Sequence, residues 1–251
     1  METLYMNGSI EEIASIVIFS GDPWRVEVLK QYLDNVKHVA FKREFNTYTG
    51  TYKGVPITVT STGIGAPSAA IAMEEMYECG MKVAVRMGTV MSLIDNTLGD
   101  FIIPVGAVRR ESTSKTYVEE AFPAVADFSL VQSMNESVET YSKNHLNGIT
   151  ATLDGFYSQM HDSKFSVEKK RNMNSVFDEL KDMGVIGLDM ESSLILTLGR
   201  LMGVKTAIVT VVTVLENLKE VLVGQDRPDA EDLLCRVVLE GLYNYSKKEG
   251  V

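Results

Sequence analysis

Basic residues, cysteines and histidines are scarce in this chain of 251 residues. It carries 24 lysines and arginines against 34 aspartates and glutamates, which gives a formal net charge of −10 at pH 7. Such an acidic protein is not expected to bind nucleic acid or an anionic membrane surface, because both are negatively charged. Two cysteines, Cys79 and Cys235, are too few for a disulfide framework, and His38, His145 and His161 are too scattered for a metal site. No metal is therefore expected.

The chain also lacks long apolar runs. No stretch of about 18 apolar residues is present, so no membrane span is expected. Residues 1–4 do not combine a basic start with an apolar core, and no signal peptide is predicted. A cytoplasmic location is the expectation for such a chain. Because neither a linker nor an internal repeat interrupts the sequence, residues 1–251 are expected to form one domain with a well-buried core.

Short apolar runs alternate with helical patterns along the chain. Runs of apolar and β-branched residues predict strands at 16–19, 47–52, 57–61, 83–87, 101–108, 148–153 and 205–214. Helical spacing predicts helices at 24–33, 68–78, 128–144, 176–183, 187–201 and 229–247. This alternation indicates an α/β fold, a single domain with a central mixed β-sheet flanked by helices. The polar segment 162–174 is expected to form a mobile flap.

Three arginines stand in separate motifs, each with the context of an anion site. Arg25 ends the run GDPWR at 21–25, Arg43 begins REF at 43–45, and Arg86 begins RMGT at 86–89, at the end of a predicted strand. Guanidinium groups are planar, multidentate donors that suit phosphate. One arginine alone more often forms a surface salt bridge, but three in these contexts favour a shared site for a small dianion.

These runs resemble the nucleoside phosphorylase I family, and within it the uridine phosphorylase branch. The resemblance extends from Gly21 to the closing helix. The matching runs are GDPWRV at 21–26, REF at 43–45, STGIGAPS at 61–68, RMGT at 86–89, FPAVADF at 122–128, FY at 156–157 and ME at 190–191. Each run is weak alone, and their order and spacing make the match specific. FPAVADF is typical of the uridine branch.

The resemblance implies a reversible phosphorolysis with uridine as the expected substrate. Inorganic phosphate would be the co-substrate, free base and (deoxy)ribose 1-phosphate the products, and no redox cofactor would take part. Phosphate would be held by Gly21, Arg25, Arg86 and Thr89, with Arg43 supplied by a neighbouring subunit. The family's assemblies are homo-oligomers, either dimers or trimers of dimers. Some members bind a monovalent cation at the dimer interface, through residues that resemble Glu44, Ile64 and Ser68 here.

Met190 and Glu191 match the family's ribose contact. A carboxylate can accept hydrogen bonds from two sugar hydroxyls, and a methionine can pack on the sugar face. With Arg25 and Arg86, Glu191 is expected to be catalytic, since held phosphate would stabilise and then attack the ribosyl cation. The alternative for Glu191 is a carboxylate that stabilises a helix N-terminus. Asp189 departs from the family's usual glutamate, which predicts a weaker ribose contact there.

The base end departs further from the family. Phe156 matches an aromatic that flanks the base, although a single aromatic is more often a core residue. With one residue deleted, Gln159 and His161 replace the branch's Gln-x-Arg clamp; the alternative is that no clamp remains. A histidine that had to protonate to hold the base would make activity depend on pH near 6–7. Met91 replaces a glycine that lies against the base, so a reshaped pocket is expected.

Two other functions stay open. One is a purine nucleoside phosphorylase in which Glu216 acts as the general acid. The other is a catalytically degenerate homologue that binds a nucleobase or sugar phosphate, because the N-terminal segment also lacks the family's histidine near the sugar 5′-hydroxyl. A dinucleotide-binding motif is excluded, since no glycine stands three residues after Gly65.

Overall fold

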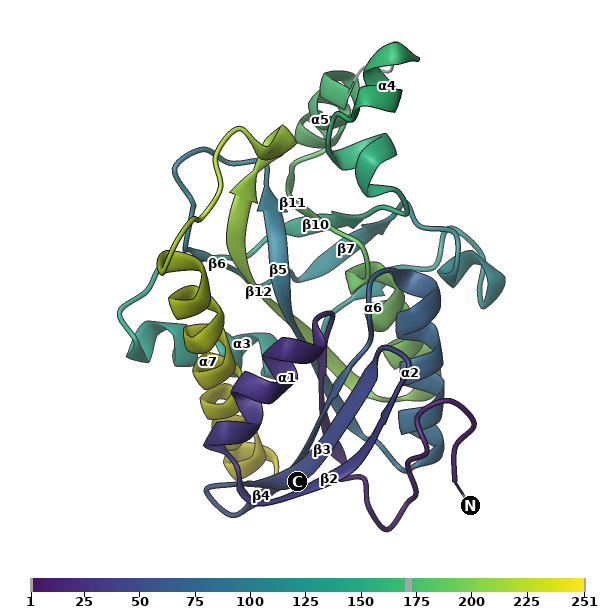
Figure 1. Ribbon diagram of the computed structural model, residues 1–251, viewed down its shortest axis with the longest axis vertical. Coiled ribbons are helices and arrows are strands. Elements are labelled where there is room, and N and C mark those ends of the chain that lie inside the picture. Colours follow the sequence, from purple (N-terminus) through teal and green to yellow (C-terminus); the bar gives the residue numbers. More distant parts are fainter. Residues whose placement is uncertain (1, 170–172, 251) are drawn as a thin grey trace.

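Strands and helices alternate along the chain and build one mixed sheet with helices on its faces (Figure 1). The computed structural model describes residues 2–169 and 173–250. The strands are β1 (Ile16–Ser20), β2 (Asp34–Lys42), β3 (Phe45–Tyr52), β4 (Val55–Ser61), β5 (Val83–Ser92), β6 (Phe101–Ile102), β7 (Gly106–Arg109), β8 (Ala124–Val125), β9 (His145–Leu146), β10 (Ile149–Thr152), β11 (Val185–Asp189) and β12 (Lys205–Leu215). The expected fold class is confirmed.

The helices differ widely in length. The α-helices are α1 (Pro23–Leu29), α2 (Ala66–Glu78), α3 (Phe128–Thr140), α4 (Lys164–Glu168), α5 (Met173–Asp182), α6 (Ser192–Met202) and α7 (Asp226–Glu249). Short helical turns are η1 (Lys30–Tyr32), η2 (Ser114–Thr116), η3 (Phe156–Met160) and η4 (Glu216–Leu218). Within the described part of the chain, no helix is long and apolar enough to cross a membrane.

The centre of the sheet is parallel. β1 lies between β4 and β5 and is parallel to both, and β12 runs parallel to β5 along nearly its whole length. At one edge β2, β3 and β4 form an antiparallel meander. On the other side β11 pairs antiparallel with β5 and leads on to β10, β7 and β8. The long strands β5 and β12 therefore run through the middle of the molecule and join its two parts (Figure 1).

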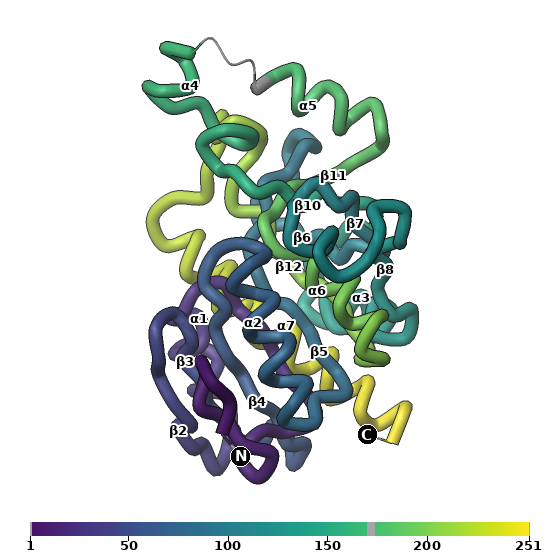
Figure 2. The backbone as a smooth tube through the Cα atoms, turned by 90° about the vertical axis from the view of Figure 1, so that its right-hand side faces the viewer, coloured from purple at the N-terminus to yellow at the C-terminus, as the bar shows by residue number. Residues whose placement is uncertain are grey.

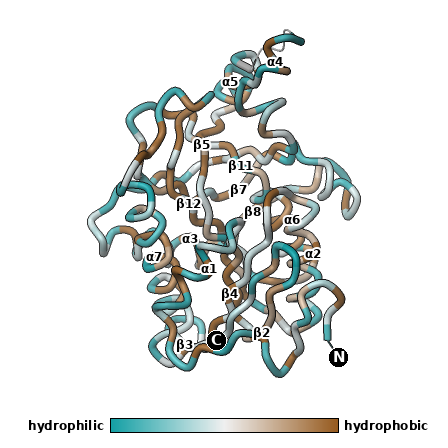
Figure 3. The backbone as a smooth tube through the Cα atoms, viewed as in Figure 1, coloured by the Kyte–Doolittle hydropathy of each residue, from teal (hydrophilic) through white to brown (hydrophobic). Residues whose placement is uncertain are grey.

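Successive residues of the central strands face two different cores. Ile16 and Ile18 of β1 pack with α1, α3 and α7, whereas Val17 and Phe19 pack with α2 and α6. Because side chains alternate across a strand, a strand covered on both faces is a continuous apolar run. Figure 3 shows this concentration of hydrophobic residues along β5 and β12. The strands that carry the motifs are thereby fixed from both sides.

One predicted helix begins in the wrong place. The first residues of the helix predicted at 187–201 form the buried strand β11, and α6 begins only at Ser192. A short apolar run cannot be assigned to helix or strand from its periodicity alone. Pairing of β11 with β10 and β5 decides the conformation here.

Three further strand assignments differ from the sequence prediction. The strand predicted at 101–108 is divided into β6 and β7, with Pro104, which has no N–H to donate to a ladder, between them. β2 was not predicted because most of its residues are exposed, and its polar sequence follows from its position at the edge of the sheet. β5 runs on to Ser92, so Arg86 lies inside the strand rather than at its end.

The segment predicted as a flap contains α4 and precedes most of α5, while residues 170–172 lie outside the described residues. Both views place α4 and α5 at one end of the molecule, beyond β11 (Figure 2).

Candidate active site

A cavity of about 780 Å³ lies where the motifs of the sequence converge. Its walls come from the segments that follow β1 and β4, from β5, from the end of β11 and from the end of β12. In parallel sheets, ligands bind beyond the carboxyl ends of the strands. The lining residues are Gly21, Asp22, Pro23, Arg25, Glu44, Gly63, Ile64, Arg86, Thr89, Val90, Met91, Phe156, Met160, Leu188, Asp189, Met190, Glu191, Thr213, Val214, Leu218, Val221 and Arg227.

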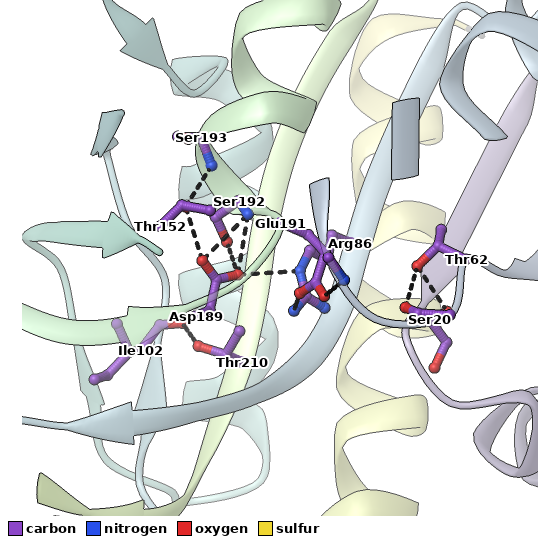
Figure 4. A network of polar contacts seen from close by, with 12 residues as sticks. Ser20, Thr62, Arg86, Ile102, Thr152, Asp189, Glu191, Ser192, Ser193 and Thr210 are labelled. Carbon is purple, nitrogen blue, oxygen red and sulfur yellow. Dashed lines mark hydrogen bonds and ion pairs between the residues drawn. The ribbon is translucent and has the colours of Figure 1, made fainter. Parts of the chain in front are cut away.

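Arg86 is buried in the cavity wall between two carboxylates (Figure 4). Its Nε donates to Oδ2 of Asp189 at 3.2 Å, and its Nη2 donates to Oε2 of Glu191. Burial acts to lower the pKa of Arg86, but the two carboxylates outweigh it and the pKa is raised. The guanidinium therefore stays charged in the absence of any ligand.

Gly88 makes room for that guanidinium. A Cβ atom at this position would lie 2.2 Å from Nη1 of Arg86, far inside van der Waals contact. The side chain of Arg86 thus lies along its own strand and covers Gly88, which is two residues further along the chain. This explains why the RMGT run needs glycine at its third place, a reason that the sequence alone did not reveal.

Arg25 is held at the start of α1, where it is only 5% exposed. Asp22 caps this helix by accepting from the backbone N–H of Trp24 at 2.9 Å, and Pro23 occupies its first turn. Nη1 of Arg25 donates to Oγ of Ser20 at 3.1 Å. Its Nε is buried and has no hydrogen-bond partner among the residues that the structure describes. A buried guanidinium N–H of a cavity-lining arginine is thus left unpaired within the described residues.

Glu231 of α7 bridges Arg25 to a second arginine. Its Oε2 lies 3.4 Å from Nη2 of Arg25, and its Oε1 lies 3.1 Å from Nε of Arg227. Arg227 lines the cavity and is half-exposed. Sequence reasoning missed both residues. The available signal was their opposite charges at a spacing of four residues, but the closing helix was predicted to begin at 229 and so left out Arg227, whereas α7 begins at Asp226.

Gly21 and Thr89 line the same cavity as the two buried arginines. A Cβ at Gly21 would make only an ordinary contact, 3.4 Å from the carbonyl oxygen of Gly63. Packing within the chain therefore does not demand glycine at position 21. Four of the five residues predicted to hold phosphate thus come together in one place.

Arg43, the fifth, lies apart from this cavity. It stands exposed in the turn between β2 and β3 with φ +53°, and its guanidinium lies 5.4 Å from the ring centre of Tyr5. Together with Leu4 and Lys42 these two residues line a separate surface pocket. The contribution of Arg43 to a neighbouring subunit stays a prediction.

Glu191 connects the arginine to the glycine-rich loop. Its Oε1 accepts from the backbone N–H of Gly65 at 2.6 Å, and its Oε2 accepts from Arg86. Burial raises the pKa of Glu191, and the charge of Arg86 opposes that shift. Although Glu191 directly precedes α6, its side chain does not cap the helix. Met190 lines the cavity beside it.

Asp189, two residues before the N-cap position, supplies a carboxylate to the start of α6 instead. Its carboxylate accepts from the backbone N–H of Ser192 at 3.0 Å, from the hydroxyl of Ser192, and from Oγ1 of Thr152 at 2.9 Å (Figure 4). With Nε of Arg86 as a further donor, protein groups occupy both of its oxygens. The sequence prediction concerned a weakened ribose contact here; the structure gives Asp189 the separate task of orienting Arg86.

The other end of the cavity is apolar. Seven lining residues belong to, or pack against, one hydrophobic core, and one of them is Met190, which lies beside Glu191. We define the apolar end as the other six: Met91, Phe156, Met160, Leu188, Val214 and Leu218. Thr213 lies next to it at a register shift between β12 and β5. Such bulges often aim side chains at functional sites. Met91 is 2% exposed and lines this end of the cavity.

Comparison with known proteins settles the family. The sequence model of the phosphorylase superfamily matches residues 15–241. The chain belongs to the phosphorylase superfamily. Among its curated relatives, the uridine phosphorylase of Thermococcus kodakarensis is 37% identical to this chain, over 80% of this chain and 73% of the relative. The uridine phosphorylase of Escherichia coli is 31% identical over 90% of each chain.

One further relative is named for a different nucleoside, and another similar protein has a solved structure. The guanosine phosphorylase of Halorubrum lacusprofundi is 31% identical over 83% of this chain and 80% of its own. A crystal structure of the uridine phosphorylase of Vibrio fischeri superposes with a TM-score of 0.86 at 32% identity, covering 97% of both chains. The resemblance to nucleoside phosphorylases, and the expected fold, are thus confirmed.

Two of the residues predicted to contact the base, Gln159 and His161, do not line the cavity. Oε1 of Gln159 accepts from the backbone N–H of Gly155 at 2.9 Å, which closes the turn η3. His161 packs with its ring centre 5.9 Å from that of Phe156 and 6.0 Å from that of Tyr157. Phe156 itself does line the cavity. Phe156 therefore lies at the cavity, whereas neither residue of the proposed clamp is part of its lining.

Glu216 is also absent from the cavity wall. It forms ion pairs with Lys181 and Lys219, the second at 3.3 Å. Burial acts to raise the pKa of Glu216, but the two lysines outweigh it and the pKa is lowered. A general acid must carry a proton near neutral pH. This environment therefore disfavours Glu216 as the acid of a purine enzyme.

The residues compared with a monovalent-cation site gather at the cavity mouth. Oγ of Ser68 donates to Oε1 of Glu44 at 2.8 Å, and Ile64 is 78% exposed. Gly63 has φ +70°, and a Cβ there would lie 2.8 Å from Cγ of Glu44. Over residues 2–169 and 173–250, no cluster of three or more His, Cys, Asp or Glu side chains could hold a metal ion.

Proposed function

We propose that this chain is a nucleoside phosphorylase, a pentosyltransferase that cleaves a nucleoside with inorganic phosphate. Uridine is the proposed substrate, and free base and (deoxy)ribose 1-phosphate are the products. One observation carries the proposal: Arg25, Arg86 and Thr89 line a single cavity together with Met190 and Glu191. The uridine phosphorylase names of several relatives agree with it.

Two buried guanidinium groups supply the phosphate end. Both are paired with carboxylates in the free protein, Arg25 with Glu231 and Arg86 with Glu191 and Asp189. A phosphate dianion replaces part of that pairing and gains charge-assisted hydrogen bonds in a water-poor site. The open approach to Gly21 allows the anion to come close to the backbone there.

The reaction needs phosphate and sugar to be held together. As the C1′–N bond breaks, its electron pair moves to the base, and a phosphate oxygen forms the new bond to C1′. Fixing both partners in one cavity converts a bimolecular step into an effectively unimolecular one, which is worth roughly 7–11 kcal/mol in favourable cases. Glu191 accepts hydrogen bonds from the ribose hydroxyls, and Met190 packs against the sugar.

Further parts of the proposal concern the assembly. The active form is a homo-oligomer, a dimer or a trimer of dimers, in which Arg43 of one subunit reaches the phosphate of the next. The exposed position of Arg43, outside the cavity of its own chain, supports this arrangement. A monovalent cation near Glu44, Ile64 and Ser68 would lie at the same interface. The enzyme acts in the cytoplasm.

Phosphate-dependent release of uracil tests the proposal. Uridine is incubated with and without phosphate, using the wild-type protein, Arg25→Gln and Arg86→Gln. Arg110→Gln is the matched control, because Arg110 pairs with Glu179 outside the cavity. Release is expected only with phosphate, to be lost in the two cavity variants, and to persist in the control. Equal release without phosphate overturns the proposal.

The second candidate is a purine nucleoside phosphorylase, favoured by the name of the guanosine phosphorylase relative. Adding guanosine and inosine to the same assay separates the two. Preference for uridine supports the leading function, and preference for a purine nucleoside supports the second. Binding of nucleoside and phosphate by calorimetry, with no turnover of any of the three, identifies a degenerate homologue.

A further inference from the structure

Arg227 occupies an unfavourable place for a cation. It lies in the first turn of α7 and lines the cavity, with its side chain half-exposed. The N-terminus of a helix carries a partial positive charge, which disfavours a basic side chain there. Its pair with Glu231 also runs in the weaker direction, because such a pair gains more when the acidic residue comes first along the helix. The stability of α7 therefore gives no reason for an arginine at this position.

Glu231 divides its carboxylate between two guanidinium groups in different surroundings. Nε of Arg227 donates to Oε1 at 3.1 Å, whereas Oε2 lies 3.4 Å from Nη2 of Arg25. The second contact is longer than a charge-assisted hydrogen bond of ordinary length, which is about 2.7–2.9 Å. The closer contact thus goes to the half-exposed arginine. Arg25, which is buried, is left less completely paired.

The other surroundings of Arg25 make the position of this carboxylate important. Nη1 of Arg25 donates to Ser20, and its Nε has no hydrogen-bond partner among the described residues. Cys235 stands one turn beyond Glu231 on α7. Burial raises the pKa of the Cys235 thiol to about 12, although the charge of Arg25 opposes this shift, so the thiol stays neutral. Glu231 therefore carries the negative charge that meets Arg25 from α7.

Building on the proposed function, we propose that Arg227 is a positioning residue for phosphate binding that acts through Glu231. Arg227 draws the carboxylate toward itself, and it remains a partner for Glu231 when phosphate takes over Arg25. Without Arg227, the carboxylate would pair with Arg25 alone. Phosphate would then have to displace a closer pair and leave a partly buried charge without a partner, which is costly.

Phosphate affinity in Arg227→Gln is the first measurement. Inorganic phosphate is titrated into the full-length protein by calorimetry, so the result does not depend on turnover. The Kd for phosphate is expected to rise by about threefold to fivefold. In initial-rate assays the KM for phosphate should rise by the same factor, while kcat and the KM for uridine stay near their wild-type values. An unchanged Kd for phosphate in this variant overturns the inference.

A double-mutant cycle separates this role from direct contact with the anion. In the Glu231→Gln background no carboxylate remains to be held, so adding Arg227→Gln is expected to leave the Kd for phosphate unchanged within about twofold. If Arg227 were itself a phosphate ligand, its loss would weaken binding by the same factor in both backgrounds. That result would overturn the inference.

Arg236→Gln is the matched control. Arg236 lies on the same helix, pairs with Asp232 four residues away at 3.1 Å, and does not belong to the cavity lining. Its loss changes the net charge equally and is expected to leave the Kd for phosphate as in the wild type. Its pair has the favourable order along the helix, so Arg236→Gln should lower the urea midpoint more than Arg227→Gln does. An equal rise of the phosphate Kd in both variants would reduce the effect to general charge and contradict the inference.

The outcomes for the proposed function remain separate. Binding of phosphate by the wild type without release of uracil overturns that function, while the cycle of binding constants still decides the role of Arg227. Phosphate-dependent release of uracil together with a flat cycle overturns the inference alone. If the wild type binds no phosphate, both are wrong.

Discussion

Asp189 holds Arg86 and the start of α6 with one carboxylate. Its Oδ2 accepts from Nε of Arg86 at 3.2 Å and from the backbone N–H of Ser192 at 3.0 Å. The guanidinium that faces the cavity is thereby fixed to a helix end. Asp189 acts on the reaction through Arg86, as a positioning residue.

Asp189→Asn is expected to weaken phosphate binding and the fold together. Removing one partner of a buried ion pair costs about 3–5 kcal/mol, and the lower end applies here because Glu191 remains beside Arg86. The KM for phosphate should rise while the KM for uridine changes less, and urea unfolding should show the lost stability. Asp229→Asn, on the exposed first turn of α7, is the control and should change neither quantity. An unchanged phosphate KM in Asp189→Asn would show that Asp189 does not orient Arg86.

Gly88→Ala is expected to displace the guanidinium of Arg86. The new methyl group would lie 2.2 Å from Nη1, so the side chain must move. A shift of about 1 Å in a catalytic group can cost roughly 10²-fold in rate. Measured kcat with uridine should fall by that order. Gly54→Ala, in a hairpin turn with open space around it, should cost about 1 kcal/mol of stability and leave kcat intact. Full activity in Gly88→Ala would contradict the close approach of the Arg86 guanidinium to Gly88.

Glu231→Gln is expected to tighten phosphate binding. Its carboxylate competes with phosphate for Arg25, and such a partly exposed pair is worth about 0.2–1 kcal/mol. Loss of the charge should lower the KM for phosphate by roughly twofold to fivefold, as measured by initial rates at fixed uridine. Glu240→Gln, which removes a carboxylate on the same helix that pairs with Lys53, is the control. A raised phosphate KM in Glu231→Gln would mean that Glu231 supports Arg25 rather than competing for it.

Glu216→Gln is expected to affect stability but not uridine turnover. The two lysines depress the pKa of Glu216 below its ordinary value of 4.5. A depressed carboxyl pKa contributes stability above pH 4.5, and that contribution is lost as pH falls through the folded-state value. Wild type should therefore unfold at higher urea than the variant at pH 7, and the difference should shrink below pH 4.5. A selective loss of purine nucleoside cleavage in the variant would instead revive Glu216 as a general acid.

The residues assigned from the sequence to phosphate and ribose lie in short runs whose spacing along the chain is distinctive, and most of them converge in the structure. Gly21, Arg25, Arg86, Thr89 and Glu191 all reach one cavity. The partners that tune them were not predictable in the same way. Glu231 meets Arg25 only through the packing of α7 on α1, and the task of Asp189 depends on where β11 ends and α6 begins.

The errors in the fold prediction have a common physical origin. β11 and β2 are defined by the strands they pair with rather than by their own periodicity. The same holds for the base end, where Gln159 matches a motif by sequence but turns to its own backbone in η3. Local patterns predicted what each segment could do, and tertiary packing decided what it does.

Product analysis by phosphorus NMR tests the central claim most directly. Wild-type protein is incubated with uridine and inorganic phosphate, and both products are quantified. The account predicts ribose 1-phosphate and uracil in equal amounts, with a matching loss of inorganic phosphate. Free ribose in place of the sugar phosphate, or uracil formed while inorganic phosphate stays constant, would contradict it.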